Sequence, residues 1–245
     1  MAHRGVVIAV EGASAAGKSS VVRAARAAYG WSALSEAFDR LDPRPSLEFA
    51  SSRELLATER RLLREEGRRA GEANRGRARG EVVVADTGFW GPLTYAAGLV
   101  ALGRAERSVL VALGKDASAP GALPCVPDLV VYLDASAAAR HERARRDRAA
   151  HPAALEPRHA AVGAFEQSFF VRTVPSVLPG AVVRRIRALG PPEELAARLR
   201  RIVDELPGVP GPPPEPRSVA RAVVSALLAA TARSRGTVRR VSRHR

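Results

Sequence analysis

The chain has 245 residues, 46% of them hydrophobic, and a formal net charge of +14 at neutral pH. This apolar content suffices for a buried core. No apolar run reaches the ~20 residues of a bilayer span. The single cysteine, Cys125, excludes an internal disulfide. We therefore expect a soluble, cytoplasmic protein, because residues 1–5 lead directly into an apolar run and leave no room for a signal peptide.

The positive charge is concentrated near the end of the chain. Arginine supplies 37 of the 39 basic residues, and residues 217–245 hold eight arginines and no acidic residue. The composition thus indicates a mildly basic body with a basic tail. We expect no nucleic-acid binding beyond weak contacts of this tail, and the sequence leaves a homodimer open.

Residues 12–19 match the pattern G-x-x-x-x-G-K-[ST] at every fixed position, between an apolar run at 6–10 and a helical segment from residue 21. Strand, glycine-rich loop and helix in this order predict a phosphate-binding loop, in which glycines let backbone N–H groups approach phosphate oxygens. The alternative is a glycine-rich turn before an ordinary helix. The predicted ATP-binding residues are Gly12, Ala13, Ser14, Ala15, Ala16, Gly17, Lys18, Ser19 and Ser20.

Two acidic residues follow predicted strands. Residues 31–36 form a short predicted strand that ends at Glu36, and residues 81–86 form an apolar strand that ends at Asp86. The carboxyl ends of parallel strands face the ligand crevice, so both acids are candidate site residues. Glu36 would act as the general base for an acceptor hydroxyl, with a solvated acid as the alternative, and Asp86 would hold a metal-bound water, with a helix cap as the alternative.

The segments around these strands are assigned from periodicity and breakers. We expect a loop at 37–45, because prolines at 43 and 45 disfavour a regular element, and a helix from 52 to about 76 that Gly67 and Gly71 could interrupt. Phe89 and Trp90 either stack on a base or pack beneath the helix at 93–102. Residues 104–113 should continue as helix.

The second half continues the alternation of strands and helices. We expect strands at 128–134 and 182–187, an arginine-rich helix from residue 136, and helices at 159–174 and 191–206. This order predicts an α/β fold with a parallel sheet covered on both faces. The predicted organisation is a domain at 1–206, a proline-rich linker at 207–216, and a basic helix with a loose terminus at 217–245.

In order and spacing, residues 5–206 resemble the thymidylate kinase-like branch of the P-loop nucleoside and nucleotide kinases. The resemblance is carried by Glu11 before the phosphate loop, by the runs at 79–86 and 127–134, by the arginine helix, and by residues 190–195. It implies the P-loop kinase fold with a five-stranded parallel sheet and a mobile, arginine-bearing lid around residues 140–150. One departure is Thr87, because the family usually has an arginine there that helps to hold the phosphoryl acceptor.

These observations predict ATP- and Mg²⁺-dependent phosphoryl transfer to a small molecule. Arg143 and Arg146 share a helix face by their spacing and would close over the donor phosphates. The predicted catalytic residues are Lys18, Glu36, Asp86, Arg143 and Arg146, and the predicted metal-binding residues are Ser19 and Asp86.

The acceptor is left open between two classes. A nucleoside or nucleotide is the first expectation, and a hydroxylated non-nucleotide such as an antibiotic or a sugar is the alternative. A third hypothesis is a nucleotide-binding regulator without kinase activity, which only the basic tail favours.

Overall fold

The protein folds around a single parallel sheet of five strands. A computed structural model describes residues 5–46, 48–146, 157–178, 181–206 and 214–242. The strand order is β2-β3-β1-β4-β5, and every neighbouring pair is parallel. The strands are β1 Val6–Glu11, β2 Ser32–Leu34, β3 Val82–Asp86, β4 Leu129–Asp134 and β5 Val182–Arg187. The predicted α/β fold with a five-stranded parallel sheet is confirmed.

The register of the central strands brings acidic residues to one edge of the sheet. Val10 of β1 pairs with Asp86 of β3, and Glu11 pairs with Tyr132 of β4. The valine-rich strands β1, β3 and β4 are buried along most of their length, as parallel strands covered on both faces must be. Their carboxyl ends therefore place Glu11 and Asp86 beside the phosphate loop, which follows β1 directly.

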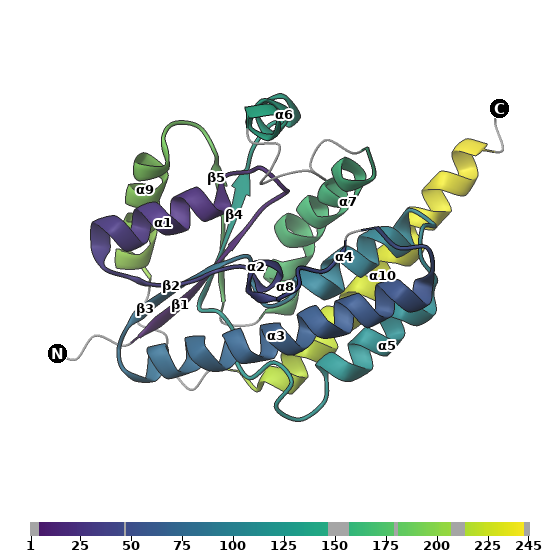
Figure 1. Cartoon of the computed structure of the whole chain (residues 1–245), viewed down its shortest axis with the longest axis horizontal. Helices are drawn as coiled ribbons and strands as arrows, with labels where there is room; N and C mark the ends of the chain where they lie inside the picture. Colours follow the sequence, from purple (N-terminus) through teal and green to yellow (C-terminus); the bar gives the residue numbers. More distant parts are fainter. Residues whose placement is uncertain (1–4, 47, 147–156, 179–180, 207–213, 243–245) are drawn as a thin grey trace.

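Helices cover both faces of the sheet. Figure 1 shows α1 (Lys18–Tyr29) and α9 (Pro192–Asp204) on one face, and α3 (Ser52–Ala78), α4 (Gly91–Ala101), α5 (Arg107–Ala117) and α10 (Pro216–Ser242) on the other. The remaining helical segments are α2 Ala37–Arg40, α6 Ala137–Arg146, α7 Pro157–Ser168, a π-helical turn Phe169–Thr173, and α8 Val174–Val177. Each face has its own apolar core.

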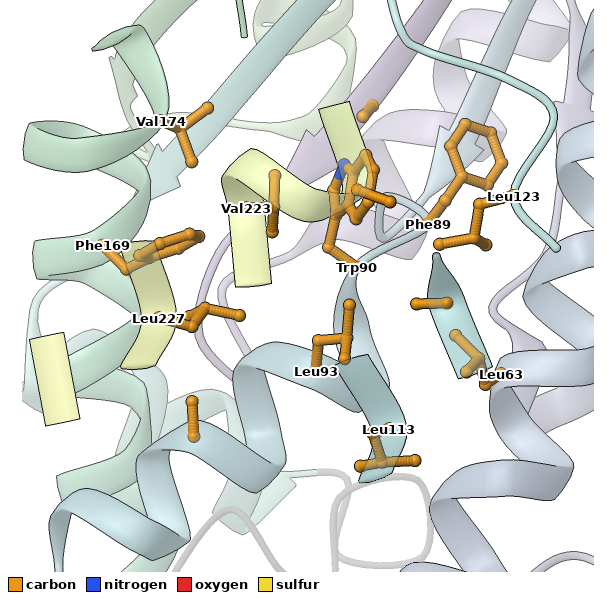
Figure 2. Close-up of a cluster of buried hydrophobic side chains, with 14 of the residues drawn as sticks. Leu63, Phe89, Trp90, Leu93, Leu113, Leu123, Phe169, Val174, Val223 and Leu227 are labelled. Atoms are coloured by element: carbon orange, nitrogen blue, oxygen red, sulfur yellow. The ribbon is translucent and has the colours of Figure 1, made fainter. Parts of the chain in front are cut away.

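The larger core fixes the positions of Phe89 and Trp90. Both side chains are buried among leucines and valines from several helices, as Figure 2 shows. Phe89 is fully buried and Trp90 is 2% exposed. Of the two interpretations offered by the sequence, the structure therefore shows packing within the core, and neither ring presents a free face to a ligand.

Two local expectations were wrong. The helix α3 is continuous through Gly67 and Gly71, and Gly67 has a packing reason, because a Cβ there would lie 2.5 Å from the carbonyl oxygen of Ala122. Residues 37–40 form the short helix α2 where a loop was expected. A single helical turn fits before Pro43, so the prolines limit its length without excluding it.

The described part of the basic tail packs into the core of the body. Val219, Ala220, Val223 and Leu227 of α10 are buried in the larger cluster, where α10 contacts α4 and α5. Residues 207–213 of the expected linker and 243–245 of the expected loose terminus lie outside the described residues. None of the described helices combines the length and apolar character of a bilayer span.

The burial of α10 predicts that it contributes to the stability of the whole domain. Leu227→Ala removes a fully buried side chain and should lower the free energy of unfolding by about 2–5 kcal/mol. Leu189→Ala is the matched control, because Leu189 is 63% exposed and its truncation should cost less than about 0.5 kcal/mol. Urea denaturation followed by circular dichroism measures both, and equal effects would show that α10 is not part of the cooperative core.

Candidate active site

The phosphate loop has the backbone conformation that its glycines allow. Gly12 and Gly17 have φ angles of 150° and 99°, and Ala15 also lies in the left-handed region at 60°. Gly17 immediately precedes α1, and no side chain among the described residues caps this helix. The first N–H groups of α1 are therefore left for another acceptor, and a helix N-terminus of this kind favours anions such as phosphate.

Lys18 and Arg143 lie on the phosphate loop. The Lys18 Nζ donates to the carbonyl oxygen of Gly12 at 2.9 Å. Arg143 of α6 donates to the carbonyl oxygen of Ala16 at 2.7 Å and to that of Ala188, after β5, at 3.1 Å. Two of the predicted catalytic residues thus meet at the loop, and both bring positive charge to the place where phosphates would bind.

Arg146 is placed elsewhere. Its Nε lies 3.0 Å from Glu142 Oε1 on the exposed side of α6, in an i,i+4 ion pair. Positions three apart on a helix differ by about 60° in direction, and an available carboxylate draws the side chain further away. The structure therefore does not bring Arg146 to the loop with Arg143. Residues 147–150 of the expected lid lie outside the described residues.

Asp86 ends β3 with its carboxylate buried. The residue is 4% exposed, and its Oδ1 has no hydrogen-bond partner among the described residues. Such an oxygen is available to a metal-bound water, so the site fits the Mg²⁺ that accompanies ATP. Ser19 is exposed in the first turn of α1. The described residues include no cluster of three acidic, histidine or cysteine ligands, so phosphate oxygens and water would complete the shell.

A buried arginine from α3 takes up the space beside Thr87. Arg69 is fully buried and donates through Nη2 to the carbonyl oxygens of Asp86 at 2.8 Å and Thr87 at 3.0 Å. Its Nη1 donates to Glu66. Thr87 has a φ of 63°, and its N–H donates to the carbonyl oxygen of Val10. A buried positive charge from a distant helix therefore lies beside Thr87, where the resemblance led us to expect an arginine.

Glu36 lies at the same edge of the sheet. It precedes α2 and is half-buried. Burial raises the pKa of its carboxyl above 4.5, the charge of Lys18 opposes this rise, and the charge of Asp86 adds to it. The strand register agrees with this, because Leu34 of β2 pairs with Ala85 of β3, and Glu36 and Asp86 thus follow neighbouring strand ends. A raised pKa makes its carboxylate a better proton acceptor, provided that it is ionised when the acceptor binds.

Sequence reasoning missed three further acids around this edge. Burial raises the pKa of Glu11 to about 8, although its Oε1 accepts the N–H of Gly88 at 2.9 Å. Burial also raises the pKa of Glu66 to about 7, against the opposing charge of Arg69. Glu166 of α7 accepts from Thr94 Oγ1 at 3.2 Å, and burial raises its pKa to about 7. Only Glu11 carried a signal, because it stands directly before the phosphate loop.

Glu59 is a fourth acidic residue that sequence reasoning missed, and of the four it has the fewest contacts that could stabilise a carboxylate. It is 1% exposed, and neither carboxylate oxygen has a hydrogen-bond partner among the described residues. Burial raises its pKa well above 4.5, and the charge of Glu166 adds to this rise. In the sequence, Glu59 lies among arginines and glutamates typical of a solvated helix face, so only the packing of α3 reveals its burial.

The strand order and the phosphate loop define an α/β fold that solved structures of a nucleoside kinase share. The structure is similar to deoxyadenosine kinase from M. mycoides bound to dATP, with a TM-score of 0.66 and 13% identity over 82% of this chain and 100% of that one. The same kinase with the products dCMP and dCDP gives a TM-score of 0.63 and 13% identity, over 81% and 98%.

A third structure of that kinase, with dCTP, has a TM-score of 0.56 and 13% identity, over 81% and 98% of the two chains. No protein-family model matches the chain, and no curated protein matches it. At this level of identity the likeness shows the fold, which confirms the nucleoside or nucleotide kinase resemblance at that level. The thymidylate kinase-like assignment stays a prediction.

The burial of Glu59 predicts a stability effect with a definite dependence on pH. In the folded chain Glu59 keeps its proton well above pH 4.5, whereas the unfolded chain releases it near that value, so its contribution to stability falls as pH rises. Glu59→Gln removes this loss. The variant should be close to the parent at pH 5 and about 1–3 kcal/mol more stable at pH 8.

Denaturant unfolding at both pH values measures the effect. Glu193→Gln is the control, because Glu193 is exposed in the first turn of α9, and its difference from the parent should not change with pH. A Glu59→Gln variant destabilised equally at pH 5 and pH 8 would contradict the prediction.

Proposed function

We propose that the protein is an ATP- and Mg²⁺-dependent kinase that transfers the γ-phosphoryl group to a hydroxyl of a small molecule. The observation that carries the proposal is the position of Glu36: Leu34 of β2 pairs with Ala85 of β3, so Glu36 and Asp86 follow neighbouring strand ends at the edge of the sheet that also bears the complete phosphate loop. Donor-binding and proton-accepting groups therefore share one edge of the sheet. The P-loop nucleoside kinase fold supports this assignment.

The donor side would position and neutralise the triphosphate. The free N–H groups at the start of α1 and the cations Lys18 and Arg143 would bind phosphate oxygens, exchanging their present contacts with loop carbonyls for stronger charge-assisted ones. Ser19 and the unpartnered oxygen of Asp86 would hold Mg²⁺ and its water. When bound, the ion neutralises negative charge on the phosphates.

The acceptor side would supply the base. As the acceptor oxygen forms its bond to the γ-phosphorus, the bond from phosphorus to the bridging oxygen of ADP breaks, and the hydroxyl proton passes to Glu36. Phosphoryl transfer asks the protein mainly for positioning and charge stabilisation, so a single carboxylate in reach of the hydroxyl is sufficient.

The described charges favour a hydroxyl over a phosphate acceptor. Arg69 is engaged by Glu66 and two carbonyl groups, and Arg40 is paired with Glu65 and Glu72. An anionic acceptor would therefore face carboxylates whose arginine partners are already occupied. The fold supports a nucleoside as the acceptor, and the excess of acids favours the second candidate, a hydroxylated non-nucleotide.

Removal of the loop lysine should abolish transfer. Lys18→Ala should lower turnover by at least about 10²- to 10³-fold, because the transition state loses a positive charge on the moving phosphoryl group. Lys115→Ala is the matched control, since Lys115 is the only other lysine and is exposed on α5. ADP release with a panel of acceptors measures both variants. ATP binding without transfer to any acceptor, together with a nucleotide-dependent affinity for a macromolecule, would favour the regulator hypothesis instead.

The base assignment is tested at Glu36. Glu36→Gln should lower kcat by about 10²- to 10⁴-fold, the usual contribution of a general base, with a smaller effect on ATP binding. The readout is steady-state turnover together with equilibrium binding of ATP, and Glu193→Gln serves as the control. A preference for monophosphate acceptors combined with unimpaired turnover of Glu36→Gln would refute the assignment.

A further inference from the structure

The proposed mechanism assigns no role to two acidic residues, Glu59 and Glu166. Glu59 of α3 and Glu166 of α7 belong to helices that both pack against α4. Glu166 accepts from Thr94 in the first turn of α4, and the neighbouring Gln167 donates to Asp134 at the carboxyl end of β4. These contacts place Glu166 at the edge of the sheet that holds the reacting groups, and the charge of Glu166 adds to the raised pKa of Glu59. We call Glu59 and Glu166 the acid pair.

Glu59 is the member that needs explanation. It is 1% exposed, both of its oxygens lack a hydrogen-bond partner among the described residues, and no described cation contributes to its charge environment. A buried, unsatisfied carboxyl costs stability. A chain with 39 basic residues could readily place an arginine beside it, so the missing partner points to a group that arrives from outside.

Glu166 has spare capacity of the same kind. Within the described part of the chain, the Thr94 hydroxyl donates to its Oε1 at 3.2 Å. A carboxylate accepts up to about four hydrogen bonds, so Glu166 can accept from a ligand without losing this contact. Thr94 fixes the side chain from α4, and the pair is thus held by three helices.

Aromatic rings lie on α4 and α7 and in the segment just before α3. Tyr95 follows Thr94 on α4, and its ring stacks on that of His159, seven residues before Glu166 on α7, with a centroid distance of 5.8 Å. Phe49 meets the Tyr95 ring edge-on at 6.5 Å. All three side chains are half-buried. Half-buried aromatic rings on elements that also carry acidic groups are a combination that can bind organic cations, through charge-assisted hydrogen bonds and cation–π contacts.

We propose that the acceptor carries a positively charged amino group in addition to its reacting hydroxyl, and that Glu59 and Glu166 bind this ammonium group while Glu36 receives the hydroxyl proton. The inference rests on the proposed kinase function and names the class of its acceptor: a hydroxylated amine, such as an amino sugar or an aminocyclitol. Ammonium N–H groups would satisfy the unpartnered oxygens of Glu59, and their positive charge would favour release of the proton that burial keeps on this carboxyl.

Other ligands fit the acid pair less well. A phosphate on the acceptor has no N–H group to donate to the unpartnered oxygens of Glu59. A neutral hydroxyl compound brings no positive charge that would offset the cost of ionising a buried acid. A hard metal ion needs more oxygen ligands than this pair offers, and the described residues contain no cluster of three suitable side chains.

The test compares matched acceptors that differ in charge, using the full-length chain with ATP and Mg²⁺. The cationic probes are D-glucosamine and 2-deoxystreptamine, the neutral probes are their N-acetylated forms with deoxyadenosine and thymidine, and the anionic probe is thymidine monophosphate. Transfer should be fastest with the amines, and N-acetylation should lower kcat/KM by about 10²-fold, because it removes the positive charge that Glu59 and Glu166 would bind.

Variants of the acid pair locate the effect. Glu59→Gln and Glu166→Gln should each raise KM for the amines by about 10- to 10²-fold and change kcat less, while KM for the N-acetylated forms should not rise. Glu193→Gln, at an exposed position of α9, should behave as the parent chain does. Thermal unfolding verifies that each variant is folded, and Glu166→Gln carries the test if Glu59→Gln does not fold.

The outcomes separate this inference from the proposed function. Transfer that is fastest with a neutral or anionic probe, or an unchanged KM for the amines in folded variants of the acid pair, would overturn the inference and leave the kinase function intact. Absence of ADP release with every probe would overturn both.

Discussion

The geometry of the site depends on one buried cation. Arg69 reaches from the middle of α3 to the carboxyl end of β3, where it donates to the carbonyl oxygens of Asp86 and Thr87 and pairs with Glu66. A strand that ends inside a protein leaves carbonyl groups that need donors. Arg69 satisfies two of them at once and lies 5.7 Å from the ring of Phe89, so it ties the strand end, the helix and the core to one another.

The contacts of Arg69 also determine where Glu11 and Asp86 lie. With Arg69 in place, the chain turns at Thr87 in the left-handed region, and Gly88 is positioned so that its N–H donates to Glu11. A side chain at position 88 would meet the Glu11 carboxylate at 2.3 Å, so only glycine permits this close approach. Asp86 and Glu11, from adjacent strands, are thereby held side by side at the mouth of the phosphate loop.

Much of this arrangement follows from the sequence. The phosphate loop, the strands that end at Glu36 and Asp86, and the parallel sheet are visible because hydrophobic periodicity and glycine spacing are local signals. The sequence made Arg143 a candidate site residue but could not distinguish it from the neighbouring arginines. The position of α6 relative to Ala16 and Ala188 decides which arginine contacts the loop. Helical spacing predicted that Arg146 would share the face of Arg143, but the ion pair with Glu142 holds the Arg146 side chain away from the loop.

The burial of three charged residues of α3 could not be predicted from the sequence, for a different reason. These residues are Glu59, Glu66 and Arg69. They lie in a helix of low hydropathy in which arginines and glutamates alternate, and such a pattern ordinarily belongs to a solvated face. Here the helix buries charged groups as well as leucines, and only tertiary packing distinguishes the two cases. Buried ionisable groups cost stability, so those that lack a structural partner concentrate where a protein binds something. Arg69 has structural partners that explain its burial, whereas the carboxyl oxygens of Glu59 have no hydrogen-bond partner among the described residues. This contrast within one helix supports a structural role for Arg69 and the proposed ligand-binding role of Glu59.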